Sequence, residues 1–148
     1  MISEECGWLL RVGLIVVDES LPNPLIHDVP AKLGIVPARS WNRGDLVSTR
    51  GDRRWKISGF RHDFYHGYDG DAKAEVERAV AWLSAAGAAS ILEPYDAHIA
   101  ITIKLYGEKT YPTPELYFLN ETVTLVSDLG LSIDIDLYVW SGKPVLRN

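Results

Sequence analysis

The feature that most constrains the fold is an almost continuous apolar run near the start of the chain, residues 8–17, which only Arg11 and Gly13 interrupt. An apolar run without alternation is typical of a strand that is covered on both faces or lies in the middle of a sheet. We therefore predict a central strand over residues 9–17, with the other elements arranged around it.

Three later segments alternate between apolar and polar residues, which is the pattern of a strand with one covered face. In the clearest of them, Ile99, Ile101, Ile103 and Leu105 share one face. The alternation predicts that one face of the sheet is covered and that the other is at least partly open. The predicted strands of this kind are residues 53–60, 98–106 and 132–140.

Other segments have the spacing of helices that bury one side. The strongest follows Asp71, a good N-cap, and places Val76, Val80 and Leu83 on one stripe. Gly34 suits the position after a short first helix. The aromatic-rich stretch 62–70 between strand and helix is predicted to be a loop. The predicted helices are residues 25–33, 72–86 and 115–129.

Together these patterns predict one α+β domain over residues 1–148, with two layers and helices mainly on one face of a mixed sheet of about four to five strands. A chain of 148 residues is long enough to bury a substantial core. The residues expected to be buried are Leu14, Val80, Leu83, Ile101, Ile103, Leu119, Ile135 and Leu137.

Charge is distributed unevenly along the chain. The net charge is −5, yet segment 39–61 holds seven bases and two acids and so carries +5, which leaves −10 for the remainder. With Trp41 and Trp55 in the same segment, phosphate contacts and base stacking would suit an anion or a single-stranded nucleic acid. The alternative is that the tryptophans belong to the core and the arginine stems cover the sheet edge. The candidate anion-binding residues are Arg39, Arg43, Arg53 and Arg54.

The predicted last strand places four residues on one face: Asp134, Asp136, Tyr138 and Trp140. Two carboxylates at this spacing could act as general acid and base if one pKa were raised. The same spacing occurs on any solvated strand face, and exposed aromatic residues beside acids suit recognition of another protein. We favour the protein-binding interpretation and treat these four residues as the candidate partner-binding site.

Signatures of catalysis or metal binding are weak. His62, His66, Asp69 and Asp71 could supply metal ligands, but the residues between the two histidines do not indicate a shared helical face. The chain lacks the Gly-x-Ser-x-Gly, His-Glu-x-x-His and Cys-x-x-Cys patterns. We predict no catalytic residues, no metal and no cofactor, and an enzyme built on residues 62–71 is the least favoured interpretation.

The compartment is inferred by elimination. The single cysteine, Cys6, cannot form an internal disulfide. Glu4 and Glu5 stand where a signal peptide needs positive charge, and no apolar stretch reaches the length of about 20 residues that spans a bilayer. We expect a cytoplasmic protein without a membrane partner.

Two blocks of sequence resemble a known family. The first is Leu-Gly-x-x-Pro-x-x-x-Trp-x-x-Gly-Asp, from Leu33 to Asp45, followed by Trp55. The second is Ile-Asp-Ile-Asp-Leu-Tyr, from Ile133 to Tyr138. With them the chain resembles the bacterial domain-of-unknown-function family DUF4279. The resemblance implies a fold, but it implies no catalytic residues.

Two classes of function remain. The favoured hypothesis is a noncatalytic protein-binding module, in its concrete form an immunity protein that neutralises a basic toxin. The alternative is a regulator that binds an anion or nucleic acid through segment 39–61. The sequence does not indicate an oligomeric state.

Overall fold

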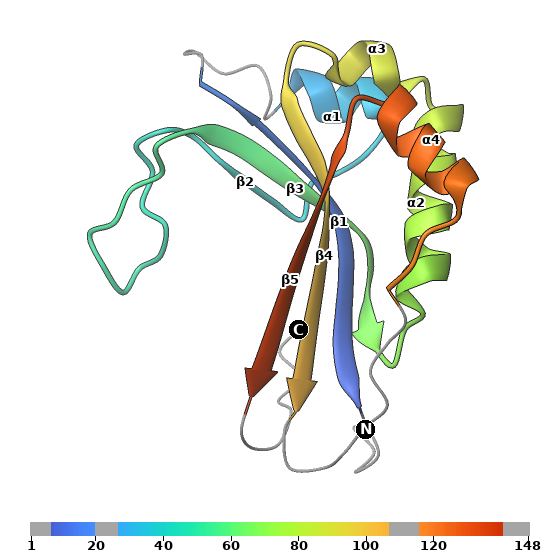
Figure 1. The fold of residues 1–148 in the computed structure, drawn as a ribbon. Helices are drawn as coiled ribbons and strands as arrows, with labels where there is room; N and C mark the ends of the chain where they lie inside the picture. The colour runs from blue at the N-terminus through green and yellow to red at the C-terminus, as the bar shows by residue number, and fades with distance from the viewer. Residues whose placement is uncertain (1–6, 20–26, 107–115, 141–148) are drawn as a thin grey trace.

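A computed structural model describes residues 7–19, 27–106 and 116–140. It contains one five-stranded mixed sheet with the strand order β2-β3-β1-β4-β5, and the helices gather on one side of it (Figure 1). The predicted α+β class, with two layers and helices on one face, is confirmed. No helix of the described ranges is long and apolar enough to cross a membrane.

The central strand is β1 (Trp8–Asp18), as the apolar run predicts. It pairs antiparallel with β3 (Ser58–Tyr68) on one side and with β4 (Asp96–Tyr106) on the other. Between residues 10 and 16 its even-numbered residues face the helices, and their side chains are fully buried. These core residues of β1 are Leu10, Val12, Leu14 and Val16.

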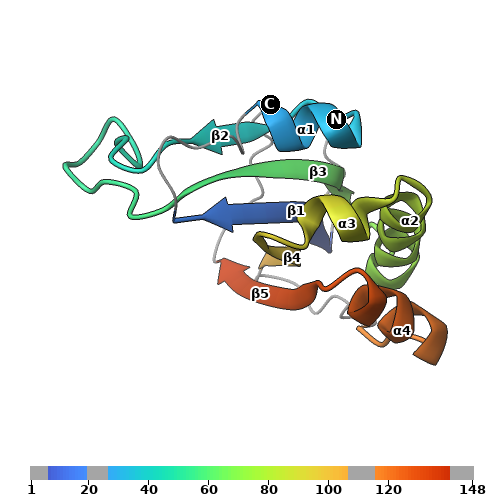
Figure 2. The same ribbon diagram turned by 90° about the horizontal axis from the view of Figure 1, so that it is seen from above.

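The two edges of the sheet are built differently (Figure 2). The three-residue β2 (Arg39–Trp41) pairs antiparallel with β3 at one edge. The nine-residue β5 (Ser132–Trp140) forms the other edge and runs parallel to β4. A parallel neighbour needs a crossover connection, and α4 (Asn120–Asp128) lies in that connection.

The helical layer rests on α2 (Ala72–Ala85), which packs against β1 and β3. The Asp71 carboxylate accepts a hydrogen bond from the backbone N–H of Ala74 at 3.1 Å, so the predicted N-cap is present. The shorter α1 (Asp28–Leu33) and α3 (Ala88–Leu92) complete the layer. Gly34 follows α1 in the left-handed region, with φ of 72°, as expected. The predicted core residues that are fully buried are Leu14, Val80, Leu83, Ile101 and Ile103.

The second strand was predicted in the wrong place. We expected a strand over 53–60 and a loop over 62–70, but β3 begins at Ser58 and continues to Tyr68. The pairing register with β1 skips Phe64, which marks a β-bulge. Gly67 and Gly70, which suggest a turn in the sequence, instead leave room for the Tyr65 ring, since an added Cβ would lie within 3 Å of that ring's atoms.

The last helix and strand also differ from prediction. The helix begins at Asn120 instead of residue 115, which is outside the described ranges, and Leu119 is its exposed N-cap residue. Ile135 and Leu137 are 45% and 59% exposed, so their predicted burial is wrong. The reason is that β5 is an edge strand and its far half runs away from α2 and α4 (Figure 1). The alternating pattern identifies the strand but not the extent of its cover.

A test of the packing between β1, β2 and β3 is provided by Gly59. An added Cβ there would lie 2.6 Å from the Val16 carbonyl oxygen and 2.9 Å from the Trp41 ring. We expect Gly59→Ala to lower the free energy of unfolding by about 1–3 kcal/mol through overpacking, as measured by urea denaturation. Gly51→Ala is the matched control, because open space surrounds Gly51. Equal stabilities of the two variants would contradict this packing.

Candidate functional site

The sheet face opposite the helices, here called the open face, carries the candidate sites. No described helix covers it (Figure 1). The register assigns to it the odd-numbered residues of β1 and the even-numbered residues of β4 and β5. Polar side chains can occupy this face without being desolvated under the described helices.

The β5 part of the open face contains three of the four predicted partner-binding residues. Asp134, Asp136 and Tyr138 pair in register with Ala100, Thr102 and Lys104 of β4, and all three are exposed. The Asp134 side chain is 59% exposed, and one of its carboxylate oxygens is 3.9 Å from His98 Nε2. The fourth residue, Trp140, has its backbone in β5, but its side chain lies outside the described part of the chain.

The opposite face of β5 is also exposed, which the sequence pattern did not indicate. Leu137 is 59% and Val139 71% exposed, although Ile103, the β4 partner of Leu137, is fully buried. The cause is that α4 packs on α2, while the far half of β5 extends past both helices. An edge strand with polar groups on one face and apolar groups on the other therefore stands free on both faces.

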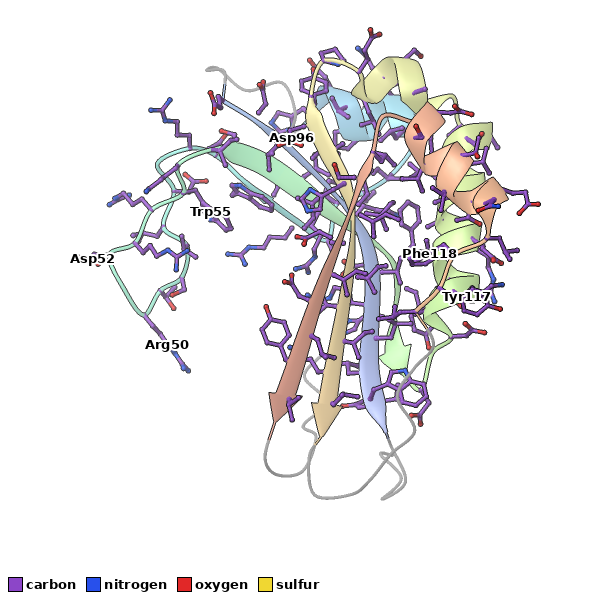
Figure 3. All side chains as sticks on the ribbon, in the orientation of Figure 1. Arg50, Asp52, Trp55, Asp96, Tyr117 and Phe118 are labelled. Atoms are coloured by element: carbon purple, nitrogen blue, oxygen red, sulfur yellow. The ribbon has the colours of Figure 1, made fainter. Side chains whose placement is uncertain are left out.

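The predicted anion-binding arginines lie on or next to residues 42–57, the loop between β2 and β3, here called the basic arm. It projects on the side away from the helices, with Arg50 and Asp52 at its tip (Figure 3). Backbone hydrogen bonds between its two limbs, such as Val47 N–H to the Arg53 carbonyl at 2.9 Å, make it a ladder-like hairpin.

Two of the four arginines are engaged in holding the basic arm. Arg39 donates to the Val47 carbonyl oxygen and Arg54 to the Gly44 carbonyl oxygen, each at 2.7 Å. Arg43 and Arg53 are exposed.

The tryptophans of this region are packed against each other. The Trp41 and Trp55 rings stack with centroids 4.5 Å apart, and Arg39 lies 5.4 Å from the Trp55 centroid. Trp41 is 8% exposed, and its indole N–H donates to the Ile57 carbonyl oxygen. This arrangement matches the packing alternative considered for these residues and leaves little ring surface for a nucleic-acid base.

The two histidines of the metal candidate are separated by the sheet. His62 pairs with Leu14 and lies against the Phe64 ring, whereas His66 pairs with Arg11 on the open face. In the described ranges no group of three or more potential ligands is close enough to hold a metal ion. Asp69 accepts a hydrogen bond from the Gly7 backbone N–H, and Asp71 is the helix cap.

A second charged group lies at the centre of the open face. Arg11 of β1 stands beside His66 and near Arg61 and Asp63 of β3. Arg61 and Asp63 form an ion pair at 3.0 Å. Burial and the Arg61 charge lower the pKa of Arg11, and burial and the Arg11 charge lower the pKa of His66. In the sequence, the feature that could have indicated this charged group is Arg11, because it is a charged residue within the most apolar strand.

A family model, Domain of unknown function (DUF4279), matches residues 10–140. The chain belongs to this family. The match covers every strand and helix of the described ranges apart from the first two residues of β1, and the resemblance carried by Leu33 to Asp45 and Ile133 to Tyr138 is thereby confirmed. No curated protein and no solved structure gives a significant match. Family membership supplies the fold context but assigns no activity to either charged group.

The charge at the centre of the open face can be tested through His66. Because burial and Arg11 disfavour the imidazolium, its pKa should be below the ordinary value of about 6.5. The folded state then binds this proton more weakly than the unfolded chain, so His66 should reduce stability as the pH falls through about 6.5. We expect Arg11→Gln to raise the His66 pKa in an NMR titration and Arg50→Gln to leave it unchanged. A pKa at or above 6.5 in the unaltered protein would contradict this.

Proposed function

We propose that the chain is a noncatalytic protein-binding module that binds its partner through β5. The observation that supports this most is the exposure of β5 on both faces at the edge of the sheet. In the described part of the chain, β4 is the only strand paired with β5. The other backbone edge of a nine-residue strand is therefore available for pairing with a partner.

Edge-strand addition provides both affinity and specificity. Main-chain hydrogen bonds attach the partner strand, and side chains on alternate faces select it. On one face of β5, Ile135, Leu137 and Val139 offer apolar contact area. On the other face, carboxylates stand beside Tyr138, an exposed aromatic residue of the kind that is enriched at interfaces.

The charge of β5 favours a basic partner. Asp134 and Asp136 project from the same face of the strand, and the chain as a whole carries −5. Complementary charge mainly increases the rate of association and selects among partners. An immunity protein that neutralises a basic toxin is the concrete form of this proposal.

Binding of an anion or nucleic acid by the basic arm is the second candidate. Exposed bases at positions such as Arg43, Arg50 and Arg53 support it. The stacked tryptophan pair and the use of Arg39 and Arg54 within the arm weigh against it. We therefore place it second.

The first experiment on this proposal concerns Tyr138. A partner is captured from the cells that encode the chain, purified, and measured by calorimetry. Tyr138→Ala should weaken binding by about 2 kcal/mol or more if the ring is a central contact. Tyr117→Ala is the matched control, because Tyr117 is similarly exposed but lies beside α2 (Figure 3). Equal losses in both variants would argue against β5 as the binding element.

The second experiment uses the salt dependence of binding. Asp134→Asn should slow association with a basic partner, most strongly at low ionic strength, because screening weakens charge steering. Asp52→Asn at the tip of the basic arm is the control of equal charge change, and we expect little effect from it. If Arg53→Ala and Arg54→Ala abolish binding instead and the retained ligand is nucleic acid, the basic-arm candidate replaces this one.

A further inference from the structure

The centre of the open face gathers positive charge from three neighbouring strands. Arg11 lies on β1, Arg61 and His66 on β3, and Lys104 on β4. The register pairs Arg11 with His66 on one side and with Thr102 on the other, and Lys104 with Leu9. These side chains therefore lie on one face of three neighbouring strands, with Arg61 opposite Ile15, four residues along β1 from Arg11.

The negative charge near this group already has a partner. Asp63 faces the cluster from β3, and its carboxylate pairs with the Arg61 guanidinium at 3.0 Å. Arg11 forms no ion pair with any described residue. Counting Arg11 and Arg61 against Asp63, and with His66 neutral, these residues carry a net charge of +1.

Arg11 also has a donor without an acceptor. Its Nε is buried from solvent and has no hydrogen-bond partner in the described residues. A buried donor that loses water without gaining an acceptor is destabilising, more so when the donor is charged. The unused donor leaves this charged group of the most apolar strand short of acceptors, and a bound anion would reduce that deficit.

We propose that Arg11, with Arg61, His66 and Lys104 around it, binds an oxyanion, the carboxylate or phosphate group of a small molecule. The planar guanidinium group matches both kinds of group with two parallel hydrogen bonds. A narrow hollow without room for a whole water molecule marks the place, and its lining residues are Leu9, Arg11, His66, Thr102 and Lys104. The hollow is narrow, so the anionic group sits at its mouth while the remainder of the ligand lies on the open face.

The electrostatics of the cluster agree with an incoming anion. Burial and then the Arg61 charge lower the pKa of Arg11. Burial and then the charges of Arg11, Arg61 and Lys104 lower the pKa of His66, while Asp63 opposes both shifts. A bound oxyanion would relieve this repulsion and favour the imidazolium form of His66. Binding should therefore raise the His66 pKa, and the bound ligand should be held more tightly at lower pH by the same linkage.

This site is independent of the proposed protein-binding function. It uses β1, β3 and β4, whereas partner binding is assigned to β5. Asp134→Asn and Tyr138→Ala should leave oxyanion binding within about twofold of the unaltered protein. The two proposals can therefore fail separately.

The experiment titrates the full chain with inorganic phosphate and, separately, with acetate, while sodium chloride keeps the ionic strength constant. NMR follows the His66 ring and the Arg11 Nε–H. We expect saturable shifts of both groups and a rise in the His66 pKa at saturation with at least one probe. The tighter probe identifies phosphate or carboxylate as the recognised group. Absence of a saturable response to both probes, or an unchanged His66 pKa, would overturn the proposal.

Two variants distinguish a specific anion-binding site from nonspecific electrostatic attraction of anions. Arg11→Gln should weaken binding of the better probe about tenfold or more, because it removes the planar charged fork. Arg50→Gln removes the same charge at the tip of the basic arm and should change affinity less than twofold. Equal weakening by both variants would show nonspecific attraction and overturn the site. If Arg11→Gln does not fold, the titration of the unaltered protein still decides.

Discussion

The pairing of β1 on both sides is the constraint on which the rest of the structure depends. A strand with antiparallel neighbours on each edge cannot rotate or slip by one residue without exchanging its two faces. Leu10, Val12 and Leu14 therefore stay under α2, and Arg11 between them must stay on the open face. The same register brings His66 beside Arg11 from a strand that lies more than fifty residues later in the sequence. The apolar core and the charged group around Arg11 thus both result from the alternation of β1 side chains between the two faces of the sheet.

The edge strand β5, unlike the central β1, is held by one neighbouring strand in the described part of the chain. Because β5 runs parallel to β4, the chain must cross over before it, and α4 in that crossover packs on α2 instead of covering the length of β5. Free edges invite pairing with any other strand, and inserted charges are a common protection against it. Asp134 and Asp136 would face their own copies in some registers of a β5–β5 pair, which opposes self-association there. The same carboxylates favour a basic partner, so protection and selectivity arise from the same residues.

Much of the fold could be predicted from local patterns, because the period of two and the period of 3.6 are written within single elements. The central strand, the strand Ser132–Trp140 and the helix after Asp71 are examples. The errors arise where neighbours decide. The alternation around Trp55 reflects packing within the basic arm and not a strand of the sheet. The sequence pattern of β3 is difficult to identify as a strand because it contains charged residues, which the structure accommodates on the open face. The exposure of Leu137 depends on strand order, and the Arg11 cluster depends on register, neither of which one segment reveals.

Membership of the DUF4279 family assigns no activity, so the function must be inferred from the side chains of the open face. That face has two charge regions of opposite sign, a positive centre at Arg11 and a negative edge at Asp134 and Asp136. Lys104 and Tyr138 are neighbours across β4 and β5, so the regions adjoin. Opposite charges arranged side by side orient a partner as well as attract it.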